Sequence, residues 1–427
     1  MIKKSHYITN SNGKKALHTI LNAGLDASSP ILYLKNYISK NKIFTKSSSI
    51  DLKKFDNVFL IAIGKSAGIM AEHAVKKINF KSGLIIVPND VNPNLKKSSF
   101  SIIKAGHPQP NSSSFTAGKK LIKFLDQTKK NDFVLFLISG GGSALAVSPY
   151  SISLKEKIKV NDVLIRSGAN IYEIACVRKH LSLIKGGRLL ENMLCSGISL
   201  ISSDVIGDDP GSISSGISYC DKTTYQDALN IIKKYSIIKK IPNAALSQLK
   251  LGVKGKIPET PKKPKIPYII ISNNFNCLTQ MKDKALELGY SVKILKNLTG
   301  DVNYVSEFLK STALKSKKNC ILFGGEPTVN VVGNGKGGRN QELILHLYEK
   351  LKNNKNYFEF ASIGTDGIDG NTKFAGAEFS NRKLFPVKKF LKTNNSSSFF
   401  KKFGGLIETG ITQNNVNDIG VIIKITE

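Results

Sequence analysis

A glycine-rich stretch, GGEPTVNVVGNGKGGRNQEL at residues 324–343, has the composition of an anion-binding loop. Glycines at 333, 335, 337 and 338 surround Lys336, and Arg339 follows directly. Glycine permits positive φ, so backbone N–H groups in such a loop can turn toward a bound anion. A helix beginning at Arg339 would add the positive end of its dipole. The stretch therefore predicts contacts of Gly335, Gly337 and Gly338 with phosphate or carboxylate.

Two other interpretations of this stretch remain open. Residues 333–338 spell G-x-G-x-x-G, and Glu359 lies about 20 residues further on, as in dinucleotide-binding folds. Only four residues separate the apolar run 320–323 from the run 328–332, and so short a connection favours a hairpin over a parallel crossover. An ordinary glycine-rich turn is the second alternative.

Two strand-like segments also end in loops suited to anions. IAIGKSAG places Lys65 between an expected strand at 58–63 and a helix of small residues, although an ordinary surface lysine has the same local sequence. FVLFLISGGGSAL is a continuous apolar run that ends in five small residues, namely Ser139, Gly140, Gly141, Gly142 and Ser143. Such a loop can wrap N–H groups around phosphate oxygens. No G-x-S-x-G elbow surrounds Ser139, so phosphate contact is favoured over acyl chemistry.

Further charged residues cluster in polar segments. Arg178, Ser182 and Lys185 have helical spacing, and we expect them near one face of a helix that Gly186 and Gly187 end. Asp204, Asp208 and Asp209 share one loop, where they suit either magnesium or turn and helix capping. In GTDGIDG, Asp366 and Asp369 could accept a proton, bind a metal or shape a turn.

Composition restricts the class of protein. The 427 residues favour two domains, and 41% hydrophobic residues indicate a folded chain. The net charge of +32 comes from scattered lysines without a run of five basic residues, so we expect no nucleic-acid partner. Lysine outnumbers arginine by 58 to 5, which makes each arginine informative. Five cysteines without C-x-x-C spacing, and the lack of a signal peptide or of a run of roughly 18 apolar residues, predict a cytoplasmic protein without a membrane partner.

Short apolar runs alternate with glycine loops and helical stretches, which predicts an α/β protein with a mostly parallel sheet in its N-terminal part. Four prolines with a period of three, at 258, 261, 264 and 267, predict a semi-rigid spacer. The expected organisation is an N-terminal domain at 1–253 whose first 50 residues are largely helical, a linker at 254–267, and a second α/β domain at 268–427.

Taken in order, the segments IAIGKSA, AGHPQPNSSS, ISGGGSAL, VRKHLSLIKGGRL, SDVIGDDPGSISSG, GGEPTVNVVGNGKGGRNQE and GTDGIDG resemble the class II glycerate kinases. The resemblance covers roughly residues 15–425. It implies a Rossmann-like glycerate-kinase domain, a C-terminal MOFRL domain, and an active site in the cleft between them. It also implies phosphorylation of D-glycerate at its 2-hydroxyl with ATP and a divalent metal such as Mg²⁺. Some members are named hydroxypyruvate reductase, which keeps an NAD(P)H-dependent reductase as the alternative.

The resemblance also implies roles for individual residues. The suspected catalytic lysine and arginine of the family correspond to Lys65 and Arg339. We expect Arg178, Lys185, Glu326 and Asp366 to bind substrate, with Glu326 and Asp366 also candidates for the base, and Asp204 and Asp208 to bind magnesium. The partners would be glycerate and ATP, and the protein would be a monomer or a homodimer. Pro327 and Ile217 depart from the family's usual residues without removing a charge.

Overall fold

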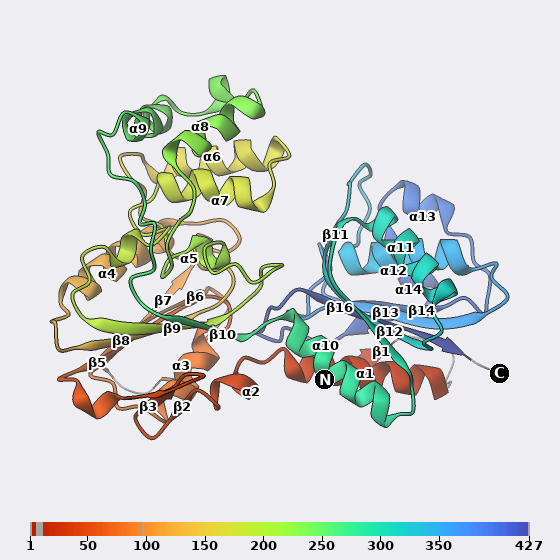
Figure 1. Cartoon of the computed structure of the whole chain (residues 1–427). Helices are drawn as coiled ribbons and strands as arrows, with labels where there is room; N and C mark the ends of the chain where they lie inside the picture. Colours follow the sequence, from red (N-terminus) through yellow and green to blue (C-terminus); the bar gives the residue numbers. More distant parts are fainter. Residues whose placement is uncertain (1, 6–11, 96–97, 426–427) are drawn as a thin grey trace. The chain divides into compact units, whose positions relative to one another are not determined.

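The computed structural model describes residues 2–5, 12–95 and 98–425. The chain forms two compact units, which we call the central unit, Pro30–Ile271, and the terminal unit, Met1–Ser29 together with Ser272–Glu427. Figure 1 labels their helices and strands. No helix in the described ranges is both long and apolar enough to cross a membrane.

The central unit is built on a six-stranded sheet whose pairs β8–β9, β5–β8, β5–β6 and β6–β7 are all parallel. In spatial order its strands are β10 (Tyr268–Ser272), β9 (Ser196–Ser202), β8 (Phe133–Ile138), β5 (Val58–Ile63), β6 (Ser82–Pro88) and β7 (Phe100–Ala105). Every residue of β5 and β8 is buried, as expected for strands covered on both faces. The predicted mostly parallel α/β domain is confirmed.

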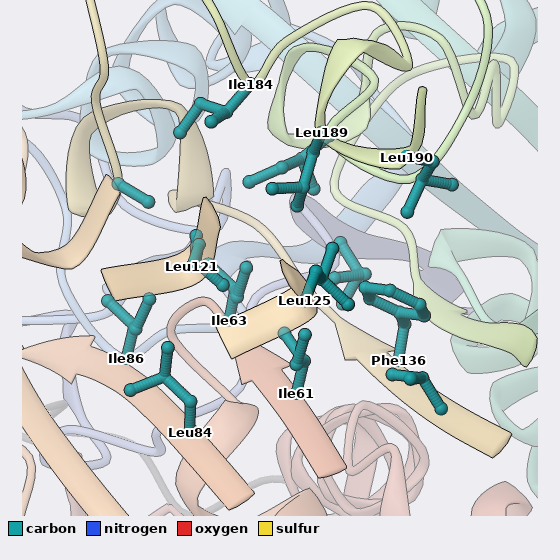
Figure 2. Packing of buried hydrophobic residues seen from close by; sticks show 14 of the residues in the cluster. Ile61, Ile63, Leu84, Ile86, Leu121, Leu125, Phe136, Ile184, Leu189 and Leu190 are labelled. Atoms are coloured by element: carbon teal, nitrogen blue, oxygen red, sulfur yellow. The ribbon is translucent and has the colours of Figure 1, made fainter. Parts of the chain in front are cut away.

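Helices cover this sheet and form separate packing clusters. One core joins Ile61 and Ile63 of β5 to Leu121 and Leu125 of the helix α4 (Figure 2). Another cluster lies among α6, α7, α8 and α9, which sit together beyond the sheet (Figure 1). The helices of the unit are α2 (Ile31–Leu34), α3 (Ala67–Val75), α4 (Ser112–Asp126), α5 (Gly142–Leu145), α6 (Leu154–Arg166), α7 (Ile171–His180), α8 (Tyr225–Lys234) and α9 (Asn243–Val253).

The terminal unit contains a seven-stranded mixed sheet, which confirms the second α/β domain. In spatial order its strands are β1 (Lys4–Ser5), β15 (Leu406–Glu408), β14 (Gly376–Ser380), β13 (Tyr357–Gly364), β16 (Asp418–Ile425), β12 (Cys320–Thr328) and β11 (Val292–Asp301). Its helices are α1 (Asn12–Ala27), α10 (Asn274–Glu287), α11 (Val302–Lys315), α12 (Arg339–Leu351), α13 (Lys388–Lys392) and α14 (Ser396–Phe403).

The expected hairpin within residues 320–332 is wrong. Gly324, Gly325 and Pro327 continue β12 instead of turning it, because β12 pairs with β11 up to Thr328 and with β16 up to Gly325. The chain then runs without regular structure to α12. Two flanking strands thus override the turn propensity of the local sequence.

The unit boundaries differ from the expected ones. The proline-rich segment 254–267 belongs to the central unit, where the carbonyls of Pro258, Pro261 and Pro267 accept hydrogen bonds from Arg188, Asp221 and Ser199. Helix α1 belongs instead to the terminal unit, because Leu17, Ile20 and Leu21 pack in a core with α10 and β16.

Residues 30–51 are not largely helical. They contain α2 and a small sheet of β2 (Ile38–Ser39), β3 (Lys42–Phe44) and β4 (Ser49–Asp51). The expectation for residues 6–11 lies outside the described residues.

Candidate functional site

Lys65 lies at the carboxyl edge of the parallel sheet in the central unit, as predicted. It follows β5 by two residues and precedes α3, and its backbone N–H donates a 2.9 Å hydrogen bond to the carbonyl of Gly140. The loops after the neighbouring strands β5 and β8 are therefore bound to each other. Because ligands of open α/β sheets bind beyond the carboxyl ends of strands, this edge is the expected position for a site.

The loop Ser139–Ser143 has two parts with different roles. Ser139 is only 2% exposed, and its Oγ accepts a hydrogen bond from Ser66 N–H at 3.0 Å. Its hydroxyl therefore fixes the loop, and its contact with phosphate stays a prediction. Gly141 has φ of 86° and turns the chain into α5. Within the described part of the protein, the N–H groups of Gly142 and Ser143 have no acceptor, as is normal in the first turn of a helix. These two amides are candidate donors for an anion.

Three polar side chains border this loop. A Cβ built on Gly140 would clash with the carboxylate of Asp204, and one on Gly141 would lie 3.0 Å from Nε2 of His107 and 3.4 Å from Cγ of Lys65. Side chains from the loops after β5, β7 and β9 thus converge on the loop after β8. The small residues at 140 and 141 are required because these side chains approach so closely. This constellation of Lys65, His107 and Asp204 is a candidate site for phosphate chemistry.

The three aspartates of the loop after β9 have separate positions. Asp204 lies against Gly140, whereas Asp209 accepts a 2.6 Å hydrogen bond from Ser212 Oγ and shapes the following turn. Asp208 has φ of 57° and its N–H donates to the carbonyl of Val205. Among the residues that the structure describes, no group of three or more His, Cys, Asp or Glu side chains has the arrangement of a metal site. Of the three aspartates, Asp204 lies against the loop that Lys65 also borders.

In the terminal unit, the glycine-rich loop 333–338 does not form the predicted cradle of free N–H groups. Gly333 donates to Oδ1 of Asn394, Gly335 to the carbonyl of Thr393, and Gly337 to Oδ1 of Asn371. A Cβ on Gly333 or Gly337 would clash with Thr393 or Ser396. The glycines are therefore required for close packing of the loop on residues 393–396. The N–H groups of Gly335 and Gly337 are bound within the protein, and contact of these glycines with phosphate stays a prediction.

The helix α12 does begin at Arg339, as predicted, but a carboxylate of the protein occupies its N-terminus. Asp369 accepts hydrogen bonds from the N–H of Asn340 at 3.0 Å and from that of Gln341 at 2.9 Å. Burial raises the pKa of Asp369, while these two N–H donors act in the opposite direction. Asp369 thus has the capping role, and Gly338 lies against it because a Cβ there would clash with its carboxyl group.

The guanidinium of Arg339 is held by two carboxylates. Nη1 donates to Glu326 at 2.6 Å and Nη2 to Asp418 at 3.2 Å, and the second oxygen of Glu326 accepts from Asn417 at 3.0 Å. Both oxygens of Glu326 are bound, and one of them orients Arg339. Its part as a base stays a prediction. Burial raises the pKa of Asp418 to about 7, although the charge of Arg339 opposes this shift. The side chain of Arg339 is still 38% exposed and has N–H groups left for a ligand.

Asp366 lies in the turn after β13, near the same group. A Cβ on Gly364 would lie 3.2 Å from Oδ1 of Asp366 and 3.5 Å from Oδ1 of Asp418. Oδ1 of Asp366 also accepts a 3.2 Å hydrogen bond from the N–H of Ile368. The structure therefore places Asp366 and Asp418 around one glycine, with Asp418 bound to Arg339.

A pocket of about 460 Å³ opens beside Arg339 within the terminal unit. It is lined by Thr328, Val329, Val331, Gly335, Gly337, Gly338, Arg339, Glu342, Gly370, Asn371 and Asn394. The lining combines valine side chains and glycine backbone with two side-chain amides, one hydroxyl, one carboxyl group and one guanidinium. Such a combination suits a small ligand that has a ring and an anionic group.

Arg178 and Lys185 do not share a helix face. Helix α7 ends at His180, because the next residues join a second segment: Pro149 forms a β-bridge with Ser182, and Leu183 N–H donates to the carbonyl of Ser148. Arg178 is on the helix, and Nε donates to Oδ1 of Asn161 at 2.9 Å. Lys185 is 1% exposed, and its ammonium donates to the carbonyls of Gly142 and Ser214.

The sequence analysis did not single out three residues that the structure places around Lys65 or Arg339. His107 lies in a Gly-His-Pro turn directly after β7, a position at a strand end that could have been recognised. Asp418 begins the last strand and Asn417 directly precedes it, and no local pattern separates them from ordinary loop residues. They become recognisable only when β16 pairs with β12, which brings Asp418 to Arg339 and Asn417 to Glu326.

Comparisons with known proteins agree with this architecture. Residues 16–250 match the family described as a domain of unknown function, DUF4147, and residues 319–418 match the MOFRL family. A protein named glycerate 2-kinase from Pyrococcus horikoshii is 35% identical over 407 residues, which cover 90% of this chain and 91% of that protein. A protein from Agrobacterium vitis named putative hydroxypyruvate reductase is 37% identical over 344 residues, 75% of this chain and 77% of that protein.

A solved structure resembles the whole fold. The crystal structure of a glycerate kinase from Thermotoga maritima superimposes with a TM-score of 0.82 at 32% sequence identity, covering 96% of this chain and 99% of the other. All three comparisons point to one group of proteins. The two family models match in the expected order, named relatives are more than 30% identical, and the solved structure superimposes on this fold. The chain therefore belongs to the glycerate 2-kinase family, with a DUF4147 domain followed by a MOFRL domain.

Proposed function

We propose that the protein transfers the γ-phosphoryl group of ATP to the 2-hydroxyl of D-glycerate, giving 2-phospho-D-glycerate and ADP. The observation that carries this proposal is the position of Lys65 at the carboxyl edge of the parallel sheet. There Lys65 borders the loop 139–143 together with His107 and Asp204. The N–H groups of Gly142 and Ser143 in this loop have no acceptor among the described residues. Cations and N–H groups aimed at one place neutralise the charge of a transferring phosphoryl group, which is the main work of a kinase.

We assign a role to each side chain from its position and its chemistry. Lys65 would neutralise the transferring phosphoryl group, and the amides of Gly142 and Ser143 would bind phosphate oxygens. Arg339 would bind a second anionic group with the N–H groups that Glu326 and Asp418 leave free. Since Lys65 belongs to the central unit and Arg339 to the terminal unit, the proposal requires both units for turnover. Asp366 remains our candidate for the base.

The pocket of about 460 Å³ is the proposed site for the nucleoside part of ATP. Val329 and Val331 offer apolar surface to a base, the glycines at 335 and 337 allow a flat ring to approach closely, and Arg339 lies where phosphates would begin. The glycine loop would thus act as a wall of the pocket and not as a cradle of N–H groups.

Magnesium fits the central unit through Asp204. Mg²⁺ in kinases usually takes one or two carboxylates, with phosphate oxygens and water completing its shell. Asp204 supplies such an oxygen ligand beside Gly140 at the edge that carries Lys65. When bound, the ion would supply positive charge that neutralises the phosphates of ATP. Asp204 would hold the metal, while Asp209 keeps its capping contact with Ser212.

The test is direct. The protein is incubated with D-glycerate, ATP and magnesium, and the product is identified by phosphorus NMR. A resonance of 2-phosphoglycerate with stoichiometric ADP is expected, and 3-phosphoglycerate would correct the position of transfer. A parallel reaction with hydroxypyruvate and NADH tests the reductase named for one relative. Oxidation of NADH without phosphorylated product would overturn the kinase.

A further inference from the structure

His107 lies at the same edge of the central sheet as Lys65. It stands two residues beyond the end of β7, as Lys65 does beyond the end of β5, and the strands between them are all parallel. The turn that carries it is held by Asn111, whose Oδ1 accepts hydrogen bonds from the N–H groups of Gly106 at 3.1 Å and Ser114 at 3.0 Å. The fold thus presents the imidazole from an anchored turn.

The Nε2 side of the imidazole faces the loop 139–143 next to Lys65. A Cβ built on Gly141 would lie 3.0 Å from Nε2 of His107 and 3.4 Å from Cγ of Lys65. Atoms of both side chains therefore lie within 3.4 Å of one point beside this loop. Both side chains are only half-buried, so a substrate can reach them.

The groups around this loop differ in whether they can take up a proton. An ammonium and a backbone N–H only donate hydrogen bonds, so Lys65 and the N–H groups of the loop stabilise negative charge but accept no proton. Asp204 is the proposed ligand of magnesium. An imidazole can accept a proton, and it is the side chain that ordinarily changes its charge between about pH 5 and 8. His107 therefore supplies a chemical capacity that its neighbours do not.

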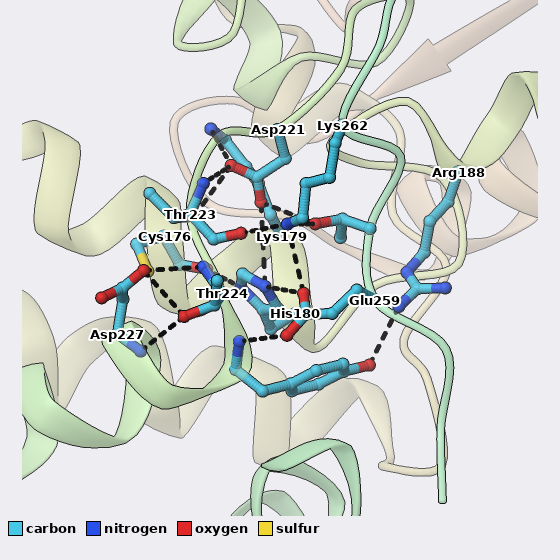
Figure 3. Close-up of polar contacts among 12 residues, drawn as sticks. Cys176, Lys179, His180, Arg188, Asp221, Thr223, Thr224, Asp227, Glu259 and Lys262 are labelled. Atoms are coloured by element: carbon cyan, nitrogen blue, oxygen red, sulfur yellow. Dashed lines mark hydrogen bonds and ion pairs between the residues drawn. The ribbon is translucent and has the colours of Figure 1, made fainter. Parts of the chain in front are cut away.

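The other described histidines of the central unit occupy different positions. His180 is fully buried, and Figure 3 shows it within a network of polar side chains. Its Nδ1 lies 2.8 Å from the carbonyl oxygen of Cys176 and its Nε2 lies 3.3 Å from Oε2 of Glu259, so both ring nitrogens face acceptors of the protein. His73 lies in the last turn of α3, roughly 10 Å along the helix from the end that follows Lys65.

We propose that His107 accepts the proton of the attacking 2-hydroxyl and thus takes the role for which Asp366 was the candidate. The inference rests on the proposed function, because it assigns one step of that reaction. The hydroxyl oxygen forms a bond to the γ-phosphorus of ATP while the bond from that phosphorus to its bridging oxygen breaks. The electron pair of the broken bond leaves with ADP. The hydroxyl proton passes to Nε2 of His107, and the imidazolium then releases it to water.

The position of His107 favours it over Asp366. His107 and Lys65 border one loop of one unit, so the proton acceptor and the cation for the phosphoryl group are held by the same fixed element. Proton transfer requires such fixed geometry between the base and the reacting group. Asp366 belongs to the other unit, where its Oδ1 accepts a 3.2 Å hydrogen bond from the N–H of Ile368.

The first experiment measures kcat/KM for D-glycerate with the full-length protein at saturating ATP and magnesium, from about pH 5.5 to 8.5. A base must be unprotonated to accept a proton, so kcat/KM should rise with pH where an imidazole titrates. The charged neighbours, a lysine and an aspartate at positions 65 and 204, ordinarily titrate outside this range, and the turn 106–111 contains no other titratable residue. A wild-type kcat/KM that falls with pH over this range would mark the imidazolium as a cation for phosphate and would overturn the proposal.

His107→Gln should lower kcat/KM by ~100-fold or more at the upper end of this range, in line with the loss of a general base. The rise with pH should also disappear. ATP titrates equally in both proteins, so its own pH dependence cancels when the two profiles are compared. A rise of the same size in His107→Gln would overturn the proposal.

Three further variants separate a base from a structural or electrostatic role. Lys65→Ala should lose turnover but keep the rise with pH, since it removes a cation and not the base. Asp366→Asn should also keep the rise. His73→Gln, at a histidine of the same unit outside this edge, should keep both turnover and rise. Loss of the rise in Asp366→Asn, with its retention in His107→Gln, would return the role to Asp366.

Chemical rescue tests the same step by a different route. Imidazole added to His107→Ala should restore turnover, and substituted imidazoles of higher basicity should restore more of it. A purely structural role predicts no such dependence on basicity, and rescue that is absent or insensitive to basicity would overturn the proposal. An active kinase whose pH profile is unchanged in His107→Gln would refute this inference alone. A wild-type protein that forms no phosphorylated product would refute the proposed function, and this inference with it.

Discussion

Glu326 accepts a 2.6 Å hydrogen bond from Nη1 of Arg339, while Asp418 accepts one of 3.2 Å from Nη2. Arg339 therefore holds two carboxylates of the protein before any ligand binds. Its planar fork allows this, since two N–H groups point in different directions from a rigid plane. The arginine that the sequence singles out has both a structural and a proposed ligand-binding role.

Replacement of Arg339 by lysine should consequently affect both activity and stability. A lysine cannot reproduce two separate N–H contacts, so kcat/KM for D-glycerate at saturating ATP should fall by roughly 10- to 150-fold. The Tm should fall as well, because the buried Asp418 loses its partner. Steady-state kinetics and thermal unfolding check both effects. Arg382→Lys, at an exposed arginine, is the matched control and should change neither. Full activity of Arg339→Lys would remove Arg339 from the site.

Lys65→Ala should lower kcat by ~100-fold or more, as does the loss of one donor that binds the transition state. The side chain lies among loops and not in a core, so the Tm should change little. The turnover of both variants is measured with D-glycerate and ATP. Lys76→Ala is the control, because Lys76 is an exposed lysine after α3. Equal turnover in the two variants would show that Lys65 is an ordinary surface charge.

Asp204→Asn should raise the magnesium concentration required for half-maximal rate, because a carboxylate ligand is lost. Magnesium is titrated at fixed ATP and D-glycerate. Asp208→Asn tests the second predicted ligand in the same way. Asp209→Asn serves as the structural control: it should lower the Tm by weakening the contact with Ser212, without changing the magnesium dependence. A magnesium dependence of Asp204→Asn equal to that of the wild type would contradict the assignment.

Glu342 should make stability depend on pH. Burial raises its pKa to about 7 in the folded protein, from the ordinary value of 4.5. It is 2% exposed, and neither carboxyl oxygen accepts a well-formed hydrogen bond among the described residues, although Ser396 lies beside it. As pH rises from 4.5 to 7, Glu342 therefore loses its proton in the unfolded chain but keeps it in the folded protein. The free energy of unfolding falls over this window as pH rises.

Glu342→Gln removes this effect. Between pH 4.5 and 8, the wild type should lose up to about 3 kcal/mol of stability that the variant keeps, corresponding to the shift of its pKa. Asp418 has a raised pKa in both proteins, so its contribution cancels in the comparison. Urea unfolding at several pH values measures the difference, with Glu287→Gln at an exposed position as control. Parallel stability curves for wild type and Glu342→Gln would contradict the prediction.

Much of the architecture was predictable because it depends on local pattern. Continuous apolar runs such as 58–63 and 133–138, each followed by small residues, suffice to predict buried parallel strands with loops at one edge. Because both loops lie at that edge, Lys65 and the loop 139–143 were correctly predicted to lie close together. The start of α12 at Arg339 was also predictable, since glycine precedes it and a polar first turn follows.

Tertiary structure decided how the polar groups are used. The sequence showed that residues 333–338 are rich in glycine, but only folding showed that residues 393–396 and Asn371 take their N–H groups. Likewise, Asp369, 30 residues after Arg339, caps α12, and the last strand supplies Asp418 to Arg339. Hydrogen-bond partners that lie far apart in sequence leave no local pattern. The residue types and strand ends were therefore set by the sequence alone. Which N–H groups and carboxylates bind one another depended on the packing of distant segments.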